Sequence, residues 1–235
     1  MQAYLSGVTE AWERGGWLEL SLFFPAQRKA LKKHPAFSIV STSAAGMMVN
    51  VDTDALAVSF EYEVSLALTK DSPFRQERFF FDVLVDGKYI AQIGQTEMRA
   101  PFFQGGLEVD LPQGMKQLCI HFPNLFSVKM RNLQFQGASL VQRHKHACRL
   151  LVLGHSLMQG YIMDAPSEAL ANRLSTRMDL EILNQALGGS SFNTLLPMKN
   201  AAGQPDAVLV SFGVNEWWRR LDNARQIILN YMTGS

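Results

Sequence analysis

Short apolar runs that end in glycine-containing polar loops dominate the last third of the chain. The first run is Leu150–Leu153, and Gly154 follows it directly. Consecutive apolar residues over this length are typical of a central strand in a parallel sheet. The next segment, Ser167–Met178, has apolar residues at helical spacing, with Ser167 in a position to cap the helix. The pattern therefore predicts a strand, a turn that carries Ser156, and then a helix.

Two later runs repeat this arrangement. Leu180–Leu183 leads into the loop Asn184–Ser191, and Ala207–Phe212 leads into Gly213–Glu216. In a parallel α/β sheet, such loops all emerge at the carboxyl edge of the strands, which is where ligands bind. We therefore expect the three loops to form one ligand-binding edge.

The preceding part of the chain has short Val-, Phe- and Leu-rich runs separated by turn residues, with little helical periodicity. Residues 57–64 alternate between apolar and polar, which indicates a strand with one buried face. Asp86-Gly87 is a hairpin signal. The pattern predicts a jelly-roll-like β-sandwich over residues 1–142, before an α/β domain over residues 143–235. The predicted strands are Gly46–Val51, Leu56–Val64, Arg78–Val85, Lys88–Ile93, Gly106–Leu111 and Gln117–Phe122.

The three loops resemble the three sequence blocks of the SGNH (GDSL-type) hydrolases. Gly154–Leu157 is similar to the first block, Asn184–Ser191 to the second and Gly213–Glu216 to the third. The resemblance implies a flavodoxin-like three-layer α/β/α domain. It also implies that Ser156 is the nucleophile, and that its own N–H, the Gly189 N–H and the Asn215 amide form an oxyanion hole.

A second, less specific resemblance concerns the β-rich part. The segment Phe81–Gly87 is similar to the accessory β-domain that precedes the catalytic domain in some SGNH hydrolases, including carbohydrate esterases. The resemblance implies that the sandwich binds carbohydrate or forms one wall of the cleft.

Two departures from the family pattern concern activity. His155 stands where the family usually carries aspartate, which is the lesser change. The family's last block, Asp-x-x-His, is absent, because no histidine follows His155 and the only aspartate after Asn215 is Asp222. A serine hydroxyl needs a base to become a good nucleophile at neutral pH, so the resemblance leaves Ser156 without its usual base.

Only three parallel strands are predicted, whereas the family's sheet generally has five in the order 2-1-3-4-5. The final predicted helix, Leu221–Tyr231, has no further strand to cross to. We therefore expect a truncated hydrolase that exposes a sheet edge, and a homodimer that covers this edge is a further hypothesis.

The histidines near the first strand allow more than one interpretation. His155 is a conceivable replacement base, but adjacent side chains on a sharp turn diverge, which favours a polar residue bonded to neighbouring loops. His144 and His146 lie at the amino end of the strand, far from the predicted site. Their spacing is compatible with metal binding, yet a solvated basic connector is favoured. The expectation is no metal and no cofactor.

Aromatic residues are candidates for sugar binding, although core packing is the usual role. Trp217 and Trp218 follow Asn215 closely, so at least one of them is expected near the mouth of the site. Five others precede the first clear strand or are expected in loops: Trp12, Trp17, Phe102, Phe103 and Phe126.

Composition narrows the class of protein. A length of 235 residues with 47% hydrophobic residues allows two cores, and a net charge of +1 gives no electrostatic reason to expect nucleic acid or an acidic membrane. No run is long enough to span a bilayer and no signal pattern opens the chain, which predicts a cytoplasmic protein without a membrane partner. Cys119 and Cys148 are expected to be buried thiols.

The two resemblances imply a serine esterase that removes acetyl groups from a carbohydrate or a similar small ester, and the missing block implies a truncated and inactive form. The alternative is a non-catalytic carbohydrate-binding or interaction module that retains a vestigial serine site. Acyl transfer to a sugar uses the same residues and stays open.

Overall fold

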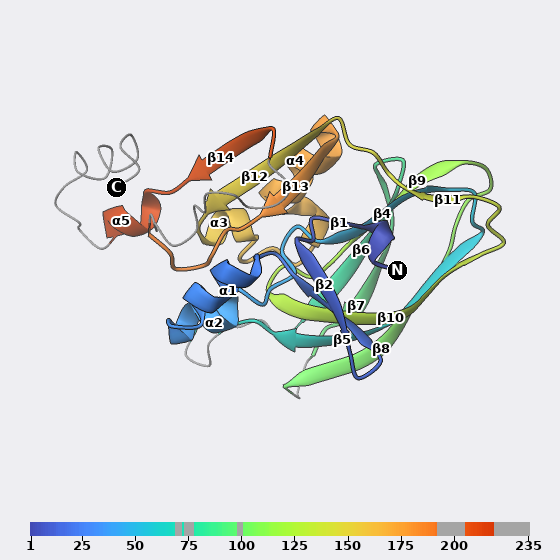
Figure 1. The fold of residues 1–235 in the computed structure, drawn as a ribbon. Helices are drawn as coiled ribbons and strands as arrows, with labels where there is room; N and C mark the ends of the chain where they lie inside the picture. The colour runs from blue at the N-terminus through green and yellow to red at the C-terminus, as the bar shows by residue number, and fades with distance from the viewer. Residues whose placement is uncertain (69–71, 73–77, 98–100, 192–204, 219–235) are drawn as a thin grey trace.

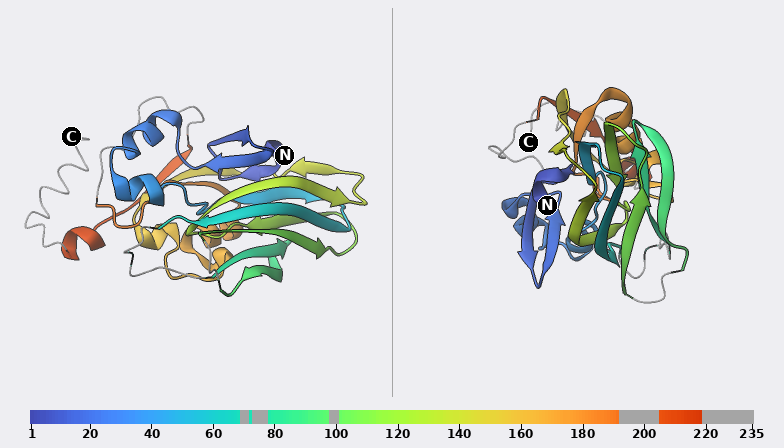
Figure 2. Two further views of the ribbon diagram at one scale, coloured as in Figure 1. Left: turned by 90° about the horizontal axis from the view of Figure 1, so that it is seen from below. Right: turned by 90° about the vertical axis from the view of Figure 1, so that its right-hand side faces the viewer.

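The computed structural model describes residues 1–68, 72, 78–97, 101–191 and 205–218, and Figures 1 and 2 show how its elements are arranged. Two antiparallel sheets come first in the chain, and a small parallel sheet with short helices follows. The predicted class, α/β plus all-β, is confirmed at this coarse level. The predicted helix Leu221–Tyr231 and Asp222 lie outside the described residues.

The first antiparallel sheet has six strands in the order β1-β4-β9-β6-β7, with β11 also paired to β4. The predicted Asp86-Gly87 hairpin joins β6 to β7, and both turn residues have positive φ, 50° and 72°, as a two-residue type I′ turn requires. The strands are β1 (Leu5–Ser6), β4 (Met48–Thr53), β6 (Phe79–Val85), β7 (Lys88–Gln95), β9 (Lys116–His121) and β11 (Val141–Arg143).

The second sheet has five strands in the order β2-β3-β10-β5-β8. Alternate residues of β5 are buried, as the pattern over residues 57–64 predicts. The expected loop position of three phenylalanines is wrong, because Phe102 and Phe103 lie in β8 and Phe126 begins β10. The strands are β2 (Glu10–Arg14), β3 (Trp17–Ser21), β5 (Ala57–Leu66), β8 (Phe102–Asp110) and β10 (Phe126–Gln136).

Aromatic rings from both antiparallel sheets share one core. Phe81 of β6 lies with its ring centroid 5.7 Å from that of Phe60 and 4.8 Å from that of Tyr62, both on β5. Each such ring contributes about 1.5 to 3 kcal/mol through burial alone. Two short helices between β3 and β4, α1 (Pro25–Leu31) and α2 (Pro35–Val40), add Leu31 and Val40 to the same core.

The parallel sheet has the order β13-β12-β14, which is the 2-1-3 order expected for the first three strands of the domain. It consists of β12 (Cys148–Gly154), β13 (Leu180–Asn184) and β14 (Ala207–Ser211). Among the described strands β14 is at the edge, and it exposes Val208 and Val210. A dimer that covers this edge stays a prediction.

Short helices connect the strands of the parallel sheet: α3 (Ser156–Gln159), the 3-10 turn η2 (Pro166–Glu168), α4 (Leu170–Met178) and α5 (Val214–Trp218). In the described part of the chain, no helix combines the length and the apolar character needed to cross a membrane. The remaining 3-10 turn, η1 (Gln2–Tyr4), precedes β1.

The predicted role of Ser167 as a helix cap is wrong. Helix α4 begins at Leu170, and its N-cap residue, Ala169, provides no side-chain cap. Instead Ser167 donates two hydrogen bonds to the buried carboxylate of Asp82, from its N–H at 2.8 Å and from its hydroxyl at 2.7 Å. A buried charge needs such donors, so this long-range contact outweighs the local capping preference.

His121 of β9 is another buried polar residue near Asp82. Its side chain is fully buried, and neither ring nitrogen has a hydrogen-bond partner among the described residues. Burial lowers the pKa of His121 to about 4, and the negative charge of Asp82 opposes this shift only in part. The imidazole is therefore neutral in the folded protein.

This burial predicts a loss of stability in weak acid. Above pH 6.5 the ring is neutral in both states, whereas between pH 6.5 and 4 it gains a proton only in the unfolded chain. The free energy of unfolding should fall by up to about 3 kcal/mol across this window. Urea unfolding at pH 7 and pH 5 should show a clearly smaller loss in His121→Leu, and an equal loss in the two proteins would contradict the assignment.

Candidate active site

The three loops named in the sequence analysis meet at the carboxyl edge of the parallel sheet. Strand β12 pairs in parallel with both neighbours, so that Val152 lies opposite Asn184 and Gly154 lies opposite Ser211. The loops after β12, β13 and β14 therefore begin at the same level of the sheet. This is the arrangement that the three apolar runs predict.

Ser156 is the first residue of α3, immediately after the turn that ends β12. His155 is the N-cap of this helix, and its ring Nδ1 accepts a hydrogen bond from the Leu157 N–H at 3.4 Å. Gly160 ends the helix with φ of 86°, in the left-handed region that glycine tolerates. The Ser156 side chain is half-buried at the start of this short, capped helix.

The second loop is hydrogen-bonded to the residue that precedes the serine turn. The carbonyl of Gly154 accepts from the Leu187 N–H at 3.0 Å and from the Ser190 hydroxyl at 3.1 Å. The Ser190 hydroxyl also lies 2.6 Å from the Leu187 carbonyl. Gly189, between these contacts, is exposed with φ of 75°. The loop is therefore fixed on both sides of Gly189.

The third loop is bonded to the second. The side-chain amide of Asn215 donates to the Ser190 carbonyl at 2.6 Å. The buried carboxylate of Glu216 accepts from the Gly213 N–H at 2.9 Å, which closes the turn before α5. A continuous chain of hydrogen bonds therefore runs from Gly154 through Ser190 to Asn215.

The structure thus places Ser156, Gly189 and Asn215 on three loops that are bonded to one another. Asn215 belongs to this hydrogen-bonded chain, Gly189 is next to Ser190, and Ser156 is two residues after Gly154. Sequence reasoning missed Ser190 and Glu216, which carry the bonds. The position of Ser190 directly after Gly189, in a loop already assigned to the site, was the available signal.

Gln159 connects the site to α2 and to the loop between α2 and β4. This fully buried residue of α3 donates from Nε2 to the Val40 carbonyl at 3.2 Å and to the Ser43 hydroxyl at 2.7 Å. Its Oε1 accepts from the Gly188 N–H at 2.6 Å. Gln185 makes a similar connection, because its Nε2 donates to the Leu22 carbonyl at 2.8 Å. The second loop is therefore positioned by both parts of the chain.

Tyr161 forms a close wall beside the second loop. A β-carbon added at Gly188 would lie 2.2 Å from the Tyr161 hydroxyl oxygen, which leaves no room for a side chain. Burial of the Tyr161 side chain raises its pKa to about 12, so the phenol is neutral. Glycine at 188 is therefore a packing requirement, whereas Gly189 next to it faces open space.

His155 caps its own helix, whereas the sequence favoured a polar residue bonded to neighbouring loops. Burial lowers its pKa, and the negative charge of Glu216 acts weakly in the opposite direction. The neutral ring accepts a hydrogen bond from the Leu157 N–H. Among the described residues, none forms a hydrogen bond with the Ser156 hydroxyl, so the geometry assigns no base to it.

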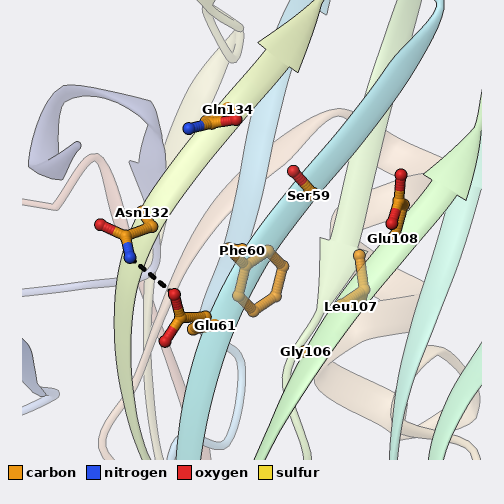
Figure 3. Close-up of a pocket in the computed structure, with 8 residues that line it drawn as sticks. All are labelled: Ser59, Phe60, Glu61, Gly106, Leu107, Glu108, Asn132 and Gln134. Atoms are coloured by element: carbon orange, nitrogen blue, oxygen red, sulfur yellow. Dashed lines mark hydrogen bonds between the residues drawn. The ribbon is translucent and has the colours of Figure 1, made fainter.

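A separate hollow of about 390 Å³ lies over β5, β8 and β10 (Figure 3), and none of the three loops lines it. Five of its eight lining residues are polar, and Asn132 donates a hydrogen bond to Glu61 at 2.6 Å within it. The one aromatic residue in the lining, Phe60, is buried in the core. The hollow therefore offers no exposed ring on which a sugar could stack.

Comparison with known proteins identifies the fold. No protein-family model matches the sequence, and no curated protein matches it. Among solved structures, the salicylyl-acyltransferase SsfX3 from a tetracycline biosynthetic pathway aligns with a TM-score of 0.76 and 17% identity, over 97% of this chain and 64% of that chain. This chain therefore spans less than two thirds of the acyltransferase's length.

Two further structures share the fold. A putative GDSL-like lipase from Bacteroides ovatus aligns with a TM-score of 0.58 and 16% identity, over 100% of this chain and 70% of that one. The third is a carbohydrate esterase whose active site displays divergent catalytic and non-catalytic binding functions. It aligns with a TM-score of 0.52 and 10% identity, over 97% of this chain and 71% of that one. The resemblance to the SGNH hydrolases is thereby confirmed at the level of the fold.

The position of Gln159 yields a stability prediction for the site. Gln159→Leu removes the partner of the buried Gly188 N–H and Ser43 hydroxyl. The free energy of unfolding, measured with urea, should therefore fall by about 1 to 3 kcal/mol. The matched control is Gln113→Leu, because Gln113 is exposed in a turn and should change stability by less than about 0.5 kcal/mol. Equal effects of the two substitutions would show that Gln159 is not a structural connection.

Proposed function

We propose that the edge formed by the three loops is an acyl-transfer site of the serine-esterase type. Ser156 attacks the ester carbonyl, and the Ser156 N–H, the Gly189 N–H and the Asn215 amide stabilise the oxyanion. The main support is the hydrogen-bonded chain from Gly154 through Ser190 to Asn215, because it preorganises donors at the strand ends. The shared fold with a GDSL-like lipase supports the same assignment.

The proposed reaction has two steps. The Ser156 oxygen forms a bond to the acyl carbon, the alcohol leaves with a proton, and the acyl group stays on the serine. Water, or a second alcohol, then attacks the acyl-serine and releases Ser156. Both steps require a base that takes a proton from the attacking hydroxyl. Because no described residue hydrogen-bonds to the Ser156 hydroxyl, we propose that this chain turns over slowly or not at all by itself.

The proposed substrate is an acetylated carbohydrate or a similar small ester. We assign residues 1–142 to a jelly-roll-like sandwich beside the site, because carbohydrate esterases are among the proteins that share the fold. Trp217 is 75% exposed on α5, two residues after Asn215. An exposed indole in this position can pack against the apolar face of a pyranose.

A second candidate function is carbohydrate binding without turnover. The observation in its favour is that no described residue acts as a base on Ser156, while the loops around it are well ordered by hydrogen bonds. A carbohydrate esterase with the same fold has an active site with both catalytic and non-catalytic binding functions. The two candidates differ in whether Ser156 becomes acylated.

Hydrolysis of a chromogenic acetate ester tests the catalytic proposal. After the rates of protein-free blanks with and without imidazole are subtracted, we expect slow release of the chromophore by the 235-residue chain, faster release when imidazole is added as an external base, and no release above the blanks in Ser156→Ala. The matched control is Ser65→Ala on β5, which should leave the rate unchanged. Turnover that persists in Ser156→Ala would refute the role of Ser156, and binding without turnover would favour the second candidate.

Binding of an acetylated oligosaccharide, measured by calorimetry, tests the proposed role of Trp217. Trp217→Ala should weaken binding by about fivefold, which corresponds to about 1 kcal/mol of lost stacking. Tyr89→Ala is the control, because Tyr89 is 56% exposed on β7 and belongs to none of the three loops. Equal affinities of wild type and Trp217→Ala would exclude the indole from the sugar site.

A further inference from the structure

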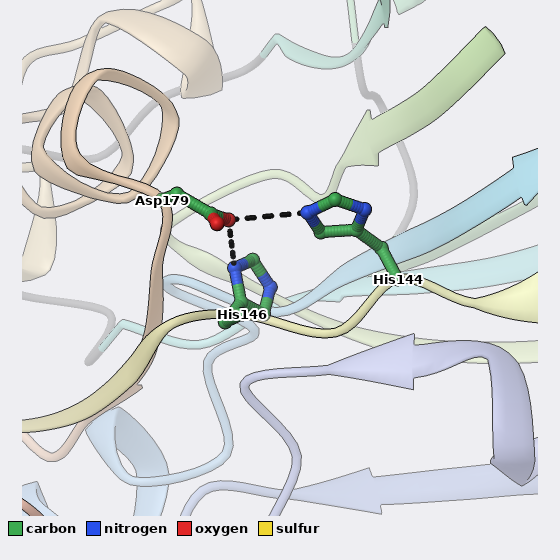
Figure 4. A group of neighbouring side chains, drawn as sticks. All are labelled: His144, His146 and Asp179. Carbon is green, nitrogen blue, oxygen red and sulfur yellow. Dashed lines mark hydrogen bonds and ion pairs between the residues drawn. The ribbon is translucent and has the colours of Figure 1, made fainter.

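A second cluster of chemically active side chains lies at the opposite end of β12. His144 and His146 belong to the connector between β11 and β12, and Asp179 lies between α4 and β13. Figure 4 shows the two imidazole rings converging on the Asp179 carboxylate. Asp179 Oδ1 lies 3.1 Å from His144 Nε2 and 3.0 Å from His146 Nδ1. The three potential ligand atoms therefore lie in one cluster.

The two histidines are more buried than the solvated connector that the sequence favoured. The side chain of His146 is 5% exposed and that of His144 is 20% exposed, whereas that of Asp179 is 50% exposed. The cluster lines a cavity of about 300 Å³, together with Met48 and Cys119 among others. A ligand could thus be held by nearly buried imidazoles and still be reached from the side of Asp179.

We propose that His144 Nε2, His146 Nδ1 and Asp179 Oδ1 bind a divalent transition-metal cation, with Zn²⁺ as the best match, and that water completes its coordination. Two imidazoles with one carboxylate form a known zinc ligand set, and tetrahedral bonds of about 2.0 to 2.2 Å separate neighbouring ligand atoms by about 3.4 Å. All three donor atoms lie within 4.8 Å of one another. Shifts of the three side chains that bring these separations to about 3.4 Å accommodate the ion.

The outer contacts of the two imidazoles support this assignment. His144 Nδ1 lies 2.7 Å from Asp52 Oδ1, which is the carboxylate–histidine arrangement that orients metal-binding histidines. His146 Nε2 lies 3.0 Å from the Asn50 side-chain amide. The Asn50 oxygen accepts from the Gln117 side-chain amide and from the Cys119 thiol, so metal binding at Nδ1 requires the Asn50 and Gln117 amides to turn together, which presents the Asn50 oxygen to the Nε2–H. One nitrogen of each ring thus contacts β4, and the other nitrogen is directed at Asp179.

The local charges also favour a cation. Asp52 and Asp179 contact the rings directly, and Asp86 lines the same cavity. The nearby carboxylate of Glu181 is already paired with Arg143 and Arg149, so it is not counted as a ligand. Three aspartates around two imidazoles create a negative potential that a divalent ion reduces.

The proposed ion would join two parts of the chain. Asp52 and Asn50 belong to β4 of the six-stranded sheet, whereas Asp179 immediately precedes β13 of the parallel sheet. The connector that carries His144 and His146 runs between them, and the Ala147 N–H donates to the Asp179 carbonyl at 3.3 Å. A metal at this place stabilises the folded chain because it binds the native arrangement and not the separated segments.

Titration of the tag-free, chelator-treated 235-residue chain with ZnCl₂, followed by calorimetry and by thermal unfolding, tests the proposal. We expect one ion per chain and a rise in Tm. Asp179→Asn should abolish stoichiometric binding and the rise in Tm. Asp52→Asn should weaken binding by about 10- to 100-fold through the outer contact. The matched control, Asp110→Asn at the exposed end of β8, should bind as wild type does.

A wild-type chain that shows no saturable binding of one Zn²⁺ would overturn the proposal, as would binding that is unchanged in Asp179→Asn. Asparagine tolerates the left-handed backbone of Asp179, which has φ of 50°, so this variant is expected to fold. Circular dichroism checks the fold before titration. If Asp179→Asn fails this check, His144→Gln takes its place, and unchanged 1:1 binding in His144→Gln overturns the proposal equally.

Discussion

The carbonyl of Gly154 is the point on which the candidate active site depends. It ends the central strand of the parallel sheet and accepts hydrogen bonds from the Leu187 N–H and the Ser190 hydroxyl. A β-carbon at this residue would lie 2.9 Å from the Met158 side chain and 3.0 Å from the Ser211 carbonyl. Only glycine therefore allows β14 and the Met158 side chain to lie this close to the end of β12. The loop that follows can then turn directly into α3 and present Ser156.

The β-rich part of the chain, with its two short helices, contributes buried polar contacts to the α/β part. Gln159 reaches Val40 and Ser43, and Asp82 accepts from Ser167. Unpaired, each of these buried groups would cost free energy comparable to a lost hydrogen bond or more. The packing of the β-rich part against the parallel sheet is therefore specified by a few directional bonds, in addition to the apolar core. This gives the β-rich part a direct role in positioning the second loop, whether or not it binds sugar.

The sequence predicts those elements whose pattern is set by burial alone. The alternation of β5, the Asp86-Gly87 hairpin and the three parallel strands follow from periodicity and turn chemistry, and both cysteines are free thiols as expected, with Cys148 only half-buried. Strand β10 was missed because a register shift between Arg131 and Gln134, with a positive φ at Asn132, interrupts its alternation.

The hydrogen-bond partners of the Gln159, Ser167 and His146 side chains lie 29 to 119 residues away along the chain. No local pattern reports contacts over such separations, and a polar residue met in sequence is by default assigned to solvent. The candidate nucleophile and its loops could be found from the sequence because they follow strand ends. The residues that hold those loops in place, and the cluster at Asp179, required the fold.

The two ends of β12 can be treated as independent sites. The strand has seven residues and rises about 3.3 Å per residue, so its ends are separated by roughly 20 Å. At this separation two unit charges interact by less than about 1 kcal/mol at an effective dielectric constant of about 20, so a charge added near Asp179 has little electrostatic effect on groups beside Ser156. The proposed cation at the amino end would therefore act on the stability of the folded chain, whereas the proposed chemistry at the carboxyl end would depend on the three loops and on the supply of a base to Ser156.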